Sequence, residues 1–297
     1  MCKKIAVIGG DMRMVYLAKM LAQKHNVLTY GQELANIKTD AMKIDNLKSA
    51  IELSDIIIGP IPFTKDGESV QAGFSKEKIV IKEVAEQCKG KTLIAGAISN
   101  EVCSYVSENG GKTIDLMKNE SLTVLNTIAT AEGTVEIAMS KTKKILQGSN
   151  VLVLGYGRVA KVVAHKFRAL GAKVTCAARR PEVFAWIEVD GYDFLNINEL
   201  GENTSKTDEN KKEKESNLES FDIVINTPPT MILNRDRLLK LKSDCLVIDL
   251  ASYPGGVDRE AVKELGLNFE WTLGLPGKVA PITAAEHIYS AIKEVIA

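Results

Sequence analysis

The chain has 297 residues, of which 45% are hydrophobic and 26% are charged, and its formal net charge is zero. This composition is typical of a globular protein with a full hydrophobic core, and the length favours two domains. A chain without a basic excess is not expected to bind nucleic acid. No apolar run approaches the roughly 18 residues that a membrane span requires, so no membrane partner is expected either.

The cysteines and histidines predict neither a disulfide framework nor a metal site. The five cysteines are odd in number, scattered and without a CxxC pair. Four of them adjoin apolar runs, and we interpret these four as small buried hydrophobic residues rather than nucleophiles. They are Cys88, Cys103, Cys176 and Cys245. Three histidines are too few for a histidine-rich metal site. The chain shows no signal-peptide pattern, so a reducing cytoplasm is the expected compartment.

In the N-terminal part of the chain, short apolar runs alternate with segments whose apolar residues recur at helical spacing. Strand and helix in alternation indicate a parallel sheet covered by helices on both faces. Helices are predicted over Met12–Lys24 and Lys76–Cys88. The predicted strands are Lys4–Ile8, Val27–Tyr30, Asp55–Gly59, Thr92–Ala95 and Lys112–Asp115.

A long segment, Asn119–Gln147, carries apolar residues at three- and four-residue steps and contains no proline. It predicts a long helix, or a kinked pair with Gly133 as the weak point, that leads out of the first domain. We therefore divide the chain into an N-terminal α/β domain at residues 1–125 and a second α/β domain at 126–281. An amphipathic helix over Ile282–Ile296 ends the chain.

The second domain repeats the alternation of strands and helices. Inside it, residues 201–217 contain no large apolar residue and interleave acids with bases, so we expect a solvent-exposed surface insertion there. The predicted strands are Asn150–Leu154, Lys173–Ala177, Phe221–Asn226, Asp244–Asp249 and Leu267–Glu270, and the helices are Arg158–Leu170, Pro181–Ile187 and Arg259–Leu265.

A GxGxxA motif lies directly after the predicted strand Asn150–Leu154 and opens the next helix. In this setting the first glycine permits a tight turn, the second lets the backbone approach a pyrophosphate, and the alanine lets helix and strand pack closely. The helix N-terminus then offers N–H groups and a positive dipole end to the phosphates. The motif residues are Gly155, Tyr156, Gly157, Arg158, Val159 and Ala160. We interpret this domain as a Rossmann dinucleotide-binding domain, and the fold as two doubly wound parallel-sheet α/β domains.

The next strand favours NADP over NAD. An NAD enzyme usually places Asp or Glu at its end, to accept a hydrogen bond from the ribose 2′-hydroxyl. Here no acid precedes Glu182, and the strand runs into Arg179 and Arg180. A guanidinium can pair with a 2′-phosphate and stack on adenine. The alternative interpretation is a pair of solvated loop arginines.

Two later turns follow strands of the same sheet and are predicted to face the nicotinamide end of the cofactor. Ligands of doubly wound sheets bind beyond the carboxyl ends of the strands. The alternative is that each is a turn rich in proline or glycine without a ligand. The predicted contacts are Thr227, Pro228, Asp249, Ala251 and Ser252.

The N-terminal domain offers candidate substrate residues. Asp11 is a good helix N-cap, and Arg13 lies in the first helical turn, where it is poorly placed for the helix dipole but well placed to hold a carboxylate. A plain surface arginine is the equal alternative. Near the end of the chain, Lys278 is a second candidate partner for a carboxylate, and the surrounding turns could frame a substrate cleft between the domains.

Together these features resemble the A subunits of bacterial dipicolinate synthases, over nearly the whole chain and in the expected order. The most specific blocks are Asp249-Leu250-Ala251-Ser252-x-Pro254-Gly255-Gly256 and Gly274-Leu275-Pro276-Gly277-Lys278-x-Ala280-Pro281-x-Thr283-Ala284. The other matching blocks are Gly9-Gly10-Asp11-x-Arg13, Gly59-Pro60-Ile61-Pro62, the motif at 155–160 and Ala178-Arg179-Arg180. More distantly, the chain is similar to 2-hydroxyacid and alanine dehydrogenases, in which the C-terminal helix, here 282–297, returns to the first domain.

The resemblance implies that a dihydrodipicolinate-type precursor loses a hydride to NADP and a proton to a base, which gives pyridine-2,6-dicarboxylate. It also implies a flavoprotein-like B subunit, together with a place in the mother cell of a sporulating bacterium, and a homo-oligomer is expected. A dicarboxylate substrate fits two cationic holders, Arg13 and Lys278. Asp11, Glu132 and Asp249 are the candidate proton acceptors, and Glu132 lies on the interdomain helix, where burial could raise its pKa.

Two alternatives stay open. One is a different NAD(P)-dependent 2-hydroxyacid or amino-acid dehydrogenase. The hydroxyacid enzymes are expected to carry a catalytic histidine late in the Rossmann domain, whereas this chain has only His25, His165 and His287. The other is a non-enzymatic regulatory subunit that binds NADP. Retained NADPH binding without substrate turnover would favour it.

Overall fold

The computed structural model describes residues 2–201 and 217–296. The chain divides into two compact units: unit 1 comprises residues 1–126 and 276–297, and unit 2 comprises residues 127–275. The predicted surface insertion at 201–217 lies almost wholly outside the described residues. No helix in the described part of the chain is long and apolar enough to cross a membrane.

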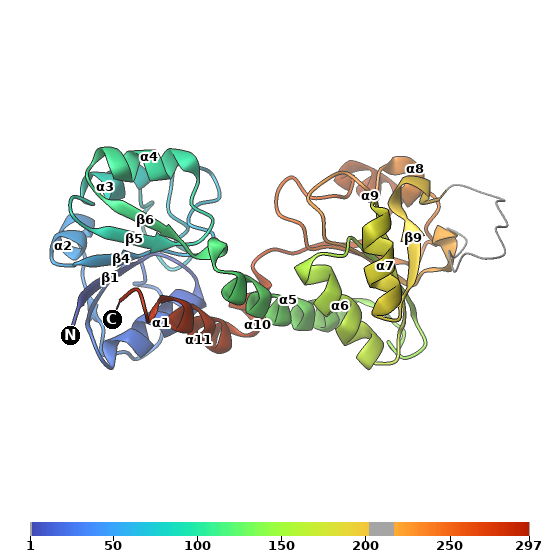
Figure 1. The fold of residues 1–297 in the computed structure, drawn as a ribbon, viewed down its shortest axis with the longest axis horizontal. Coiled ribbons are helices and arrows are strands. Elements are labelled where there is room, and N and C mark those ends of the chain that lie inside the picture. Colours follow the sequence, from blue (N-terminus) through green and yellow to red (C-terminus); the bar gives the residue numbers. More distant parts are fainter. Residues whose placement is uncertain (1, 202–216, 297) are drawn as a thin grey trace. The chain divides into compact units, whose positions relative to one another are not determined.

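Unit 1 holds a six-stranded parallel sheet in the order β3-β2-β1-β4-β5-β6 (Figure 1). The order reverses between β1 and β4, which is where doubly wound sheets bind ligands. The strands are β1 (Lys4–Ile8), β2 (Asn26–Tyr30), β3 (Met42–Lys43), β4 (Ile56–Ile58), β5 (Thr92–Ala95) and β6 (Lys112–Asp115). The helices are α1 (Met12–Ala22), α2 (Leu47–Glu52), α3 (Ile81–Glu86) and α4 (Asn100–Glu108).

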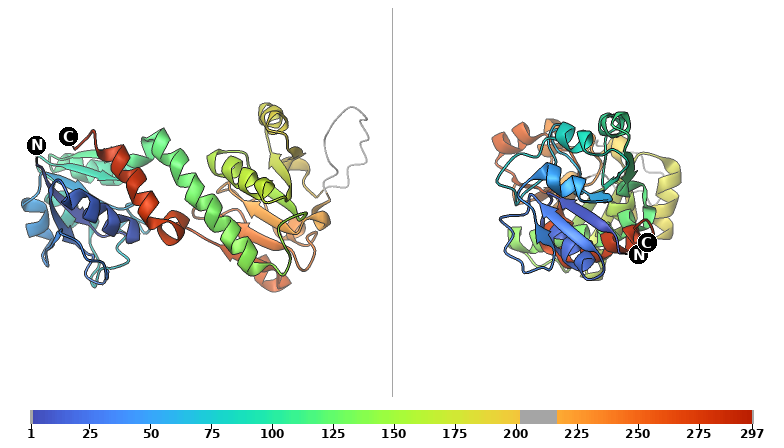
Figure 2. Two further views of the ribbon diagram at one scale, coloured as in Figure 1. Left: turned by 90° about the horizontal axis from the view of Figure 1, so that it is seen from below. Right: turned by 90° about the vertical axis from the view of Figure 1, so that its left-hand side faces the viewer.

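Helices cover both faces of this sheet. One face packs against α1 and against α11 (Pro281–Ile292), which lie side by side although about 270 residues separate them (Figure 2). The other face packs against α2, α3 and α4. The central strands β1, β4 and β5 are almost continuously apolar and buried, as expected of parallel strands covered on both sides.

Unit 2 repeats the same doubly wound plan, with strand order β12-β11-β10-β7-β8-β9 and every pair parallel. Its switch point lies between β7 and β10. The strands are β7 (Asn150–Leu154), β8 (Lys173–Ala178), β9 (Asp193–Asn196), β10 (Ile223–Asn226), β11 (Leu246–Asp249) and β12 (Asn268–Trp271). The helices are α6 (Arg158–Ala169), α7 (Pro181–Val189), α8 (Arg235–Leu238) and α9 (Arg259–Leu265).

The long segment predicted from Asn119 to Gln147 forms one helix, α5 (Glu120–Lys141), which continues through Gly133. The boundary between the two units falls within this helix. A short helix, α10 (Leu275–Val279), precedes α11.

Several short elements were not expected from the sequence, among them β3, β9 and α4. In addition, the helix predicted over Lys76–Cys88 is wrong at its start. Only Ile81–Glu86 is helical, because Ser69 and Val80 form a β-bridge and Val70 N–H donates to Ile79 O.

Candidate cofactor and substrate sites

The turn after β7 requires glycine at its first position. Gly155 has a φ of +90°, and a Cβ there would lie 2.6 Å from Oγ1 of Thr227. The hydroxyl of Thr227 is fixed because it donates to Leu154 O at 2.8 Å across the switch point. Thr227 therefore shapes the turn through Gly155.

The packing around Gly157 and Ala160, the other two small residues of the motif, differs from that around Gly155. Gly157 caps α6 with a φ of −87°, and no atom of the described residues lies within 4 Å of where its Cβ would be. The packing around it does not require glycine, so the space is open to a ligand. No side chain in the described part of the chain caps the first N–H groups of α6, which is the arrangement that binds phosphate. Ala160 is fully buried against the sheet.

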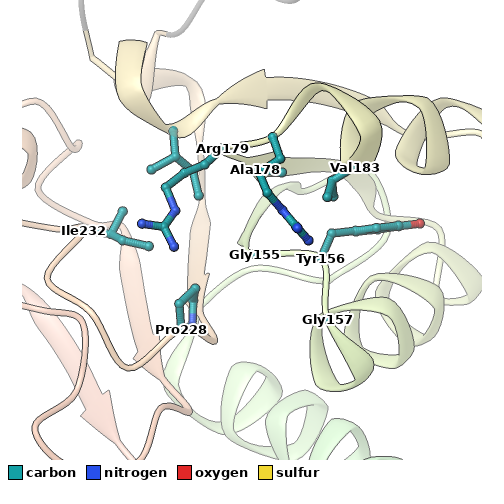
Figure 3. Close-up of a pocket in the computed structure, with 10 residues that line it drawn as sticks. Gly155, Tyr156, Gly157, Ala178, Arg179, Val183, Pro228 and Ile232 are labelled. Carbon is teal, nitrogen blue, oxygen red and sulfur yellow. The ribbon is translucent and has the colours of Figure 1, made fainter.

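A pocket of about 470 Å³ adjoins this turn. Its wall combines apolar side chains with two arginines, and its lining includes no carboxylate from the described residues. Figure 3 shows Arg179, Pro228 and Ile232 facing the same space, with the Tyr156 ring directed away from it. The lining residues are Gly155, Tyr156, Gly157, Ala178, Arg179, Arg180, Val183, Ile197, Pro228 and Ile232. Apolar walls beside two cations fit the adenosine end of a dinucleotide whose ribose carries a phosphate.

The two arginines of the pocket differ in their contacts. Both are exposed. Arg180 forms an ion pair of 3.2 Å with Glu182, whereas Arg179 has no hydrogen-bond or ion-pair partner in the described part of the chain. Exposed ion pairs are weak and exchange readily, so either guanidinium can turn to an incoming anion.

The side chain of Tyr156 stabilises the turn. Its hydroxyl donates to Asp190 Oδ2 at 2.6 Å, and its ring meets that of Tyr192 edge to face. Burial, followed by the hydrogen bond to Asp190, raises the pKa of Tyr156 well above its usual range. The phenol therefore stays protonated, and its contribution to the pocket comes from its backbone.

Among the residues predicted at the nicotinamide end, Asp249 holds the loop that follows β11. Asp249 is buried, and its carboxylate accepts from Asn226 Nδ2 at 2.7 Å, Ala251 N at 3.0 Å and Gly256 N at 2.9 Å. Ala251 is buried and its carbonyl accepts from Trp271 Nε1, while Ser252 is exposed. The lining of the pocket includes Pro228 but not Thr227, Asp249, Ala251 or Ser252.

In unit 1, Asp11 and Arg13 form a tight pair at the switch point between β1 and β4. Asp11 caps α1, as predicted, and it accepts from Nε and Nη2 of Arg13 at 2.9 and 2.7 Å. Nη2 also donates to Ile61 O, just beyond β4. Arg13 is only 4% exposed, so the interpretation as a surface arginine is wrong. Nη1 has no acceptor among the described residues.

The short helix α10 closes over this pair. A Cβ at position 277 would lie 2.5 Å from Oδ2 of Asp11 and 3.1 Å from Nε of Arg13, so only glycine fits there. The next residue, Lys278, is exposed and has no ion-pair partner in the described part of the chain. Two cations that lie far apart in the sequence therefore occupy the same part of unit 1.

The Gly9–Gly10 turn resembles a phosphate loop in sequence only. The N–H of Gly9 donates to Tyr30 O and the N–H of Gly10 donates to Gln71 O at 2.7 Å. Both donors are satisfied within the chain, so they are not available to a phosphate.

The three candidate proton acceptors are all engaged. The burial considered for Glu132 is not found, because its side chain is 52% exposed and pairs with Lys166 Nζ at 2.8 Å. Asp249 already accepts three hydrogen bonds from the chain, and Asp11 accepts from the backbone and the guanidinium of Arg13. Asp11 and Asp249 are therefore occupied by hydrogen-bond donors of the chain, whereas the ion pair of Glu132 is exposed and can exchange.

The buried cysteines are inert, as their sequence context predicts. Burial raises the pKa of the Cys88 thiol to about 11 and those of Cys176 and Cys245 to about 12. A thiol needs its thiolate form to act as a nucleophile. For Cys103 the prediction of burial is wrong, because this residue is only partly buried and its Sγ accepts from Thr113 Oγ1 at 3.4 Å.

Four residues of the pocket were not predicted as cofactor contacts: Ala178, Val183, Ile197 and Ile232. Val183 follows the arginine pair by only a few residues, so its nearness could have been anticipated. Ile197 and Ile232 come from other segments, and no local pattern distinguishes them from ordinary core residues.

Comparison with known proteins agrees with this geometry. Residues 4–117 match the family model of the N-terminal domain of the dipicolinate synthase A subunit, and residues 120–263 match that of the alanine dehydrogenase/PNT C-terminal domain. The dipicolinate synthase A subunit of Bacillus subtilis is 33% identical over 99% of this chain and 96% of its own length.

Solved structures give the same result. The crystal structure of the dipicolinate synthase A subunit from Bacillus halodurans has a TM-score of 0.86 at 29% identity, over 99% of this chain and 98% of its own. An L-alanine dehydrogenase has a TM-score of 0.62 at 14% identity, over 99% and 88% of the two chains. The second similarity shows a shared fold.

Proposed function

Since the chain belongs to the family of dipicolinate synthase A subunits, we propose that it oxidises a dihydrodipicolinate-type precursor to pyridine-2,6-dicarboxylate, with NADP as the hydride acceptor. The observation that carries the redox role is the pocket beside the GxGxxA turn, whose lining includes two arginines and no carboxylate among the described residues. We further propose a partner, a flavoprotein-like B subunit, as well as a homo-oligomeric assembly and work in the cytoplasm of the mother cell during sporulation.

In this proposal the cofactor is held by unit 2. The open face at Gly157 and the uncapped start of α6 receive the pyrophosphate. Arg179 and Arg180 receive the 2′-phosphate. NADP, when bound, supplies a two-electron acceptor for hydride.

The substrate is held by unit 1. Arg13 binds one carboxylate through Nη1, because Asp11 and Ile61 O fix the rest of the guanidinium and so remove the entropic cost of ordering it. Lys278 binds the second carboxylate. The precursor loses a hydride and a proton in total, and no heavy atom leaves.

The proton needs no strong base. Formation of an aromatic ring makes its loss from carbon favourable, so water can accept it, and Asp11 and Asp249 keep the structural roles described above. This assignment is consistent with the occupied hydrogen-bonding capacity of Asp11 and Asp249.

The test measures turnover of enzymatically generated dihydrodipicolinate with NADP or with NAD, with and without a B subunit, by the ultraviolet absorbance of the product. We expect a higher kcat/KM with NADP, and loss of that preference in the double variant Arg179→Glu/Arg180→Glu. NADPH binding without turnover under any of these conditions would instead favour a regulatory subunit.

A further inference from the structure

Arg237, on the short helix α8, is half-buried and uses every nitrogen of its guanidinium. Nε donates to Leu200 O at 3.1 Å, Nη1 to Ile232 O at 2.9 Å and Nη2 to Ile197 O at 2.8 Å. All three acceptors are backbone carbonyls, so the side chain contributes hydrogen-bond geometry rather than an ion pair. It is not itself among the residues that line the cofactor pocket.

Two of these three carbonyls belong to residues whose side chains form the apolar wall of the pocket. Ile197 follows β9, and Ile232 lies in the loop after β10, at the two sides of the sheet's switch point. Both side chains are buried, at 5% exposure each. Arg237 therefore ties together two segments that no strand pairing of the described residues joins directly.

The loop after β10 is fixed at a second point. The N–H groups of Ile232 and Leu233 both donate to Gly256 O, at 2.9 and 3.0 Å. One side of the apolar wall is thus held to the loop that Asp249 anchors. The segment 197–200 has Arg237 as its link to the loop that carries Ile232.

We infer that Arg237 is a positioning residue for the nucleotide: it fixes the spacing of Ile197 and Ile232, and that spacing sets how tightly the adenine ring is held. The inference rests on the proposed function only in taking this pocket as a nucleotide site. A guanidinium carries its donors in a rigid planar fork, whereas a lysine ammonium cannot reach three carbonyls in one plane. Arg237→Lys should consequently fail to restore the wild-type pocket.

The test compares Arg237→Met and Arg237→Lys with Arg235→Met, in the full-length chain. Arg235 is a matched control, because it lies on the same helix and its side chain pairs with the exposed Glu264, away from the pocket lining. Titration calorimetry with 2′,5′-ADP, which contains the adenine and the 2′-phosphate, should show about tenfold weaker binding for both Arg237 variants and none of this loss for Arg235→Met. Circular dichroism at the titration temperature establishes that each variant is folded.

A double-mutant cycle separates positioning from a general structural effect. If Arg237 acts through the wall, Ile232→Ala should weaken 2′,5′-ADP binding, and Arg237→Met added to it should weaken binding by much less than about tenfold. Fully additive losses, or an Arg237→Lys variant that binds 2′,5′-ADP as the wild type does, would overturn the inference.

The nucleotide probe also distinguishes this inference from the NADP assignment. Wild-type protein that binds 5′-ADP as tightly as 2′,5′-ADP would contradict NADP, while the same loss in Arg237→Met would still support the role of Arg237. Wild-type protein that binds neither nucleotide would overturn both.

Discussion

Asn226 donates a hydrogen bond of 2.7 Å from Nδ2 to Oδ1 of Asp249, and both side chains are almost completely buried. The two residues are register partners at the carboxyl ends of β10 and β11. Because Asp249 also accepts from the N–H groups of Ala251 and Gly256, the pair fixes the loop 251–256. A charge buried in this way is stable only while its donors remain in place.

Asp249→Asn should lower the free energy of unfolding by about 3 kcal/mol, because an amide cannot accept from all three donors and leaves buried groups unpaired. Urea denaturation measures the loss as a lower midpoint. The exposed Asp236→Asn is the control, with an expected change below about 0.5 kcal/mol. A variant of Asp249 with wild-type stability but no turnover would instead make this carboxylate the catalytic base.

Gly155→Ala should lower the stability of the fold, whereas Gly157→Ala should leave stability unchanged and weaken NADPH binding. Alanine at 155 must adopt a positive φ and meets Thr227 Oγ1, so we expect a loss of stability of about 2 kcal/mol. Alanine at 157 meets no atom of the described residues, so its stability should stay within about 0.5 kcal/mol of wild type. Its methyl group should weaken NADPH binding at least about tenfold, because it occupies the space that the pyrophosphate needs. Fluorescence titration measures the affinity, and unchanged binding by Gly157→Ala would place the pyrophosphate elsewhere.

Arg13→Lys should raise KM for the dicarboxylate about 10- to 100-fold, which corresponds to one charge-assisted hydrogen bond. The fork to Asp11 and Ile61 O is lost, so the remaining donor is no longer held in place. The affinity for NADPH should not change, because Arg13 does not contribute to the nucleotide pocket. Lys19→Met, an exposed change on the same helix, is the control. An unchanged KM in Arg13→Lys would exclude this arginine as the carboxylate ligand.

Asp222 makes stability depend on pH. Burial raises its pKa, but hydrogen bonds from Lys242, Asn150 N and Lys144 outweigh this and hold the pKa below the ordinary value of 3.8. The carboxylate therefore stabilises the fold above about pH 4, and this contribution is lost as the pH falls through the lower pKa of the folded state.

Accordingly, Asp222→Asn should destabilise the protein by about 1–2 kcal/mol at pH 7, and the difference from wild type should shrink as the pH falls through the lowered pKa of the folded state. Urea denaturation at a series of pH values measures it. A difference that grew as the pH fell would contradict the assignment.

The sequence predicts the central strands best, because parallel strands buried on both faces are continuous apolar runs. β1, β5 and β7 have the bounds expected from their sequences. β3 has only two residues, both exposed, and exists because β2 offers it an edge to pair with, so no periodicity marks it. Residues 76–80 show helical spacing but are not helical, and Val80 pairs with Ser69 in a β-bridge instead.

The candidate sites also differ in how far the sequence predicts them. The GxGxxA motif is local and is recognisable without a structure. The Asp11–Arg13 pair depends on Ile61 and Gly277, which the fold brings together from distant segments. Glu132 shows the limit of helical periodicity, because the spacing of apolar residues predicts a helix but does not tell which face this carboxylate occupies.

The most direct measurement counts both products of one reaction. Dihydrodipicolinate generated without oxygen is mixed with the chain, NADP and the B subunit, and then dipicolinate and NADPH are quantified together. We expect one NADPH for each dipicolinate, and no dipicolinate above the uncatalysed rate without NADP. Dipicolinate that forms equally fast without NADP, or with far less than one NADPH each, would contradict the claim that this chain transfers the hydride to NADP.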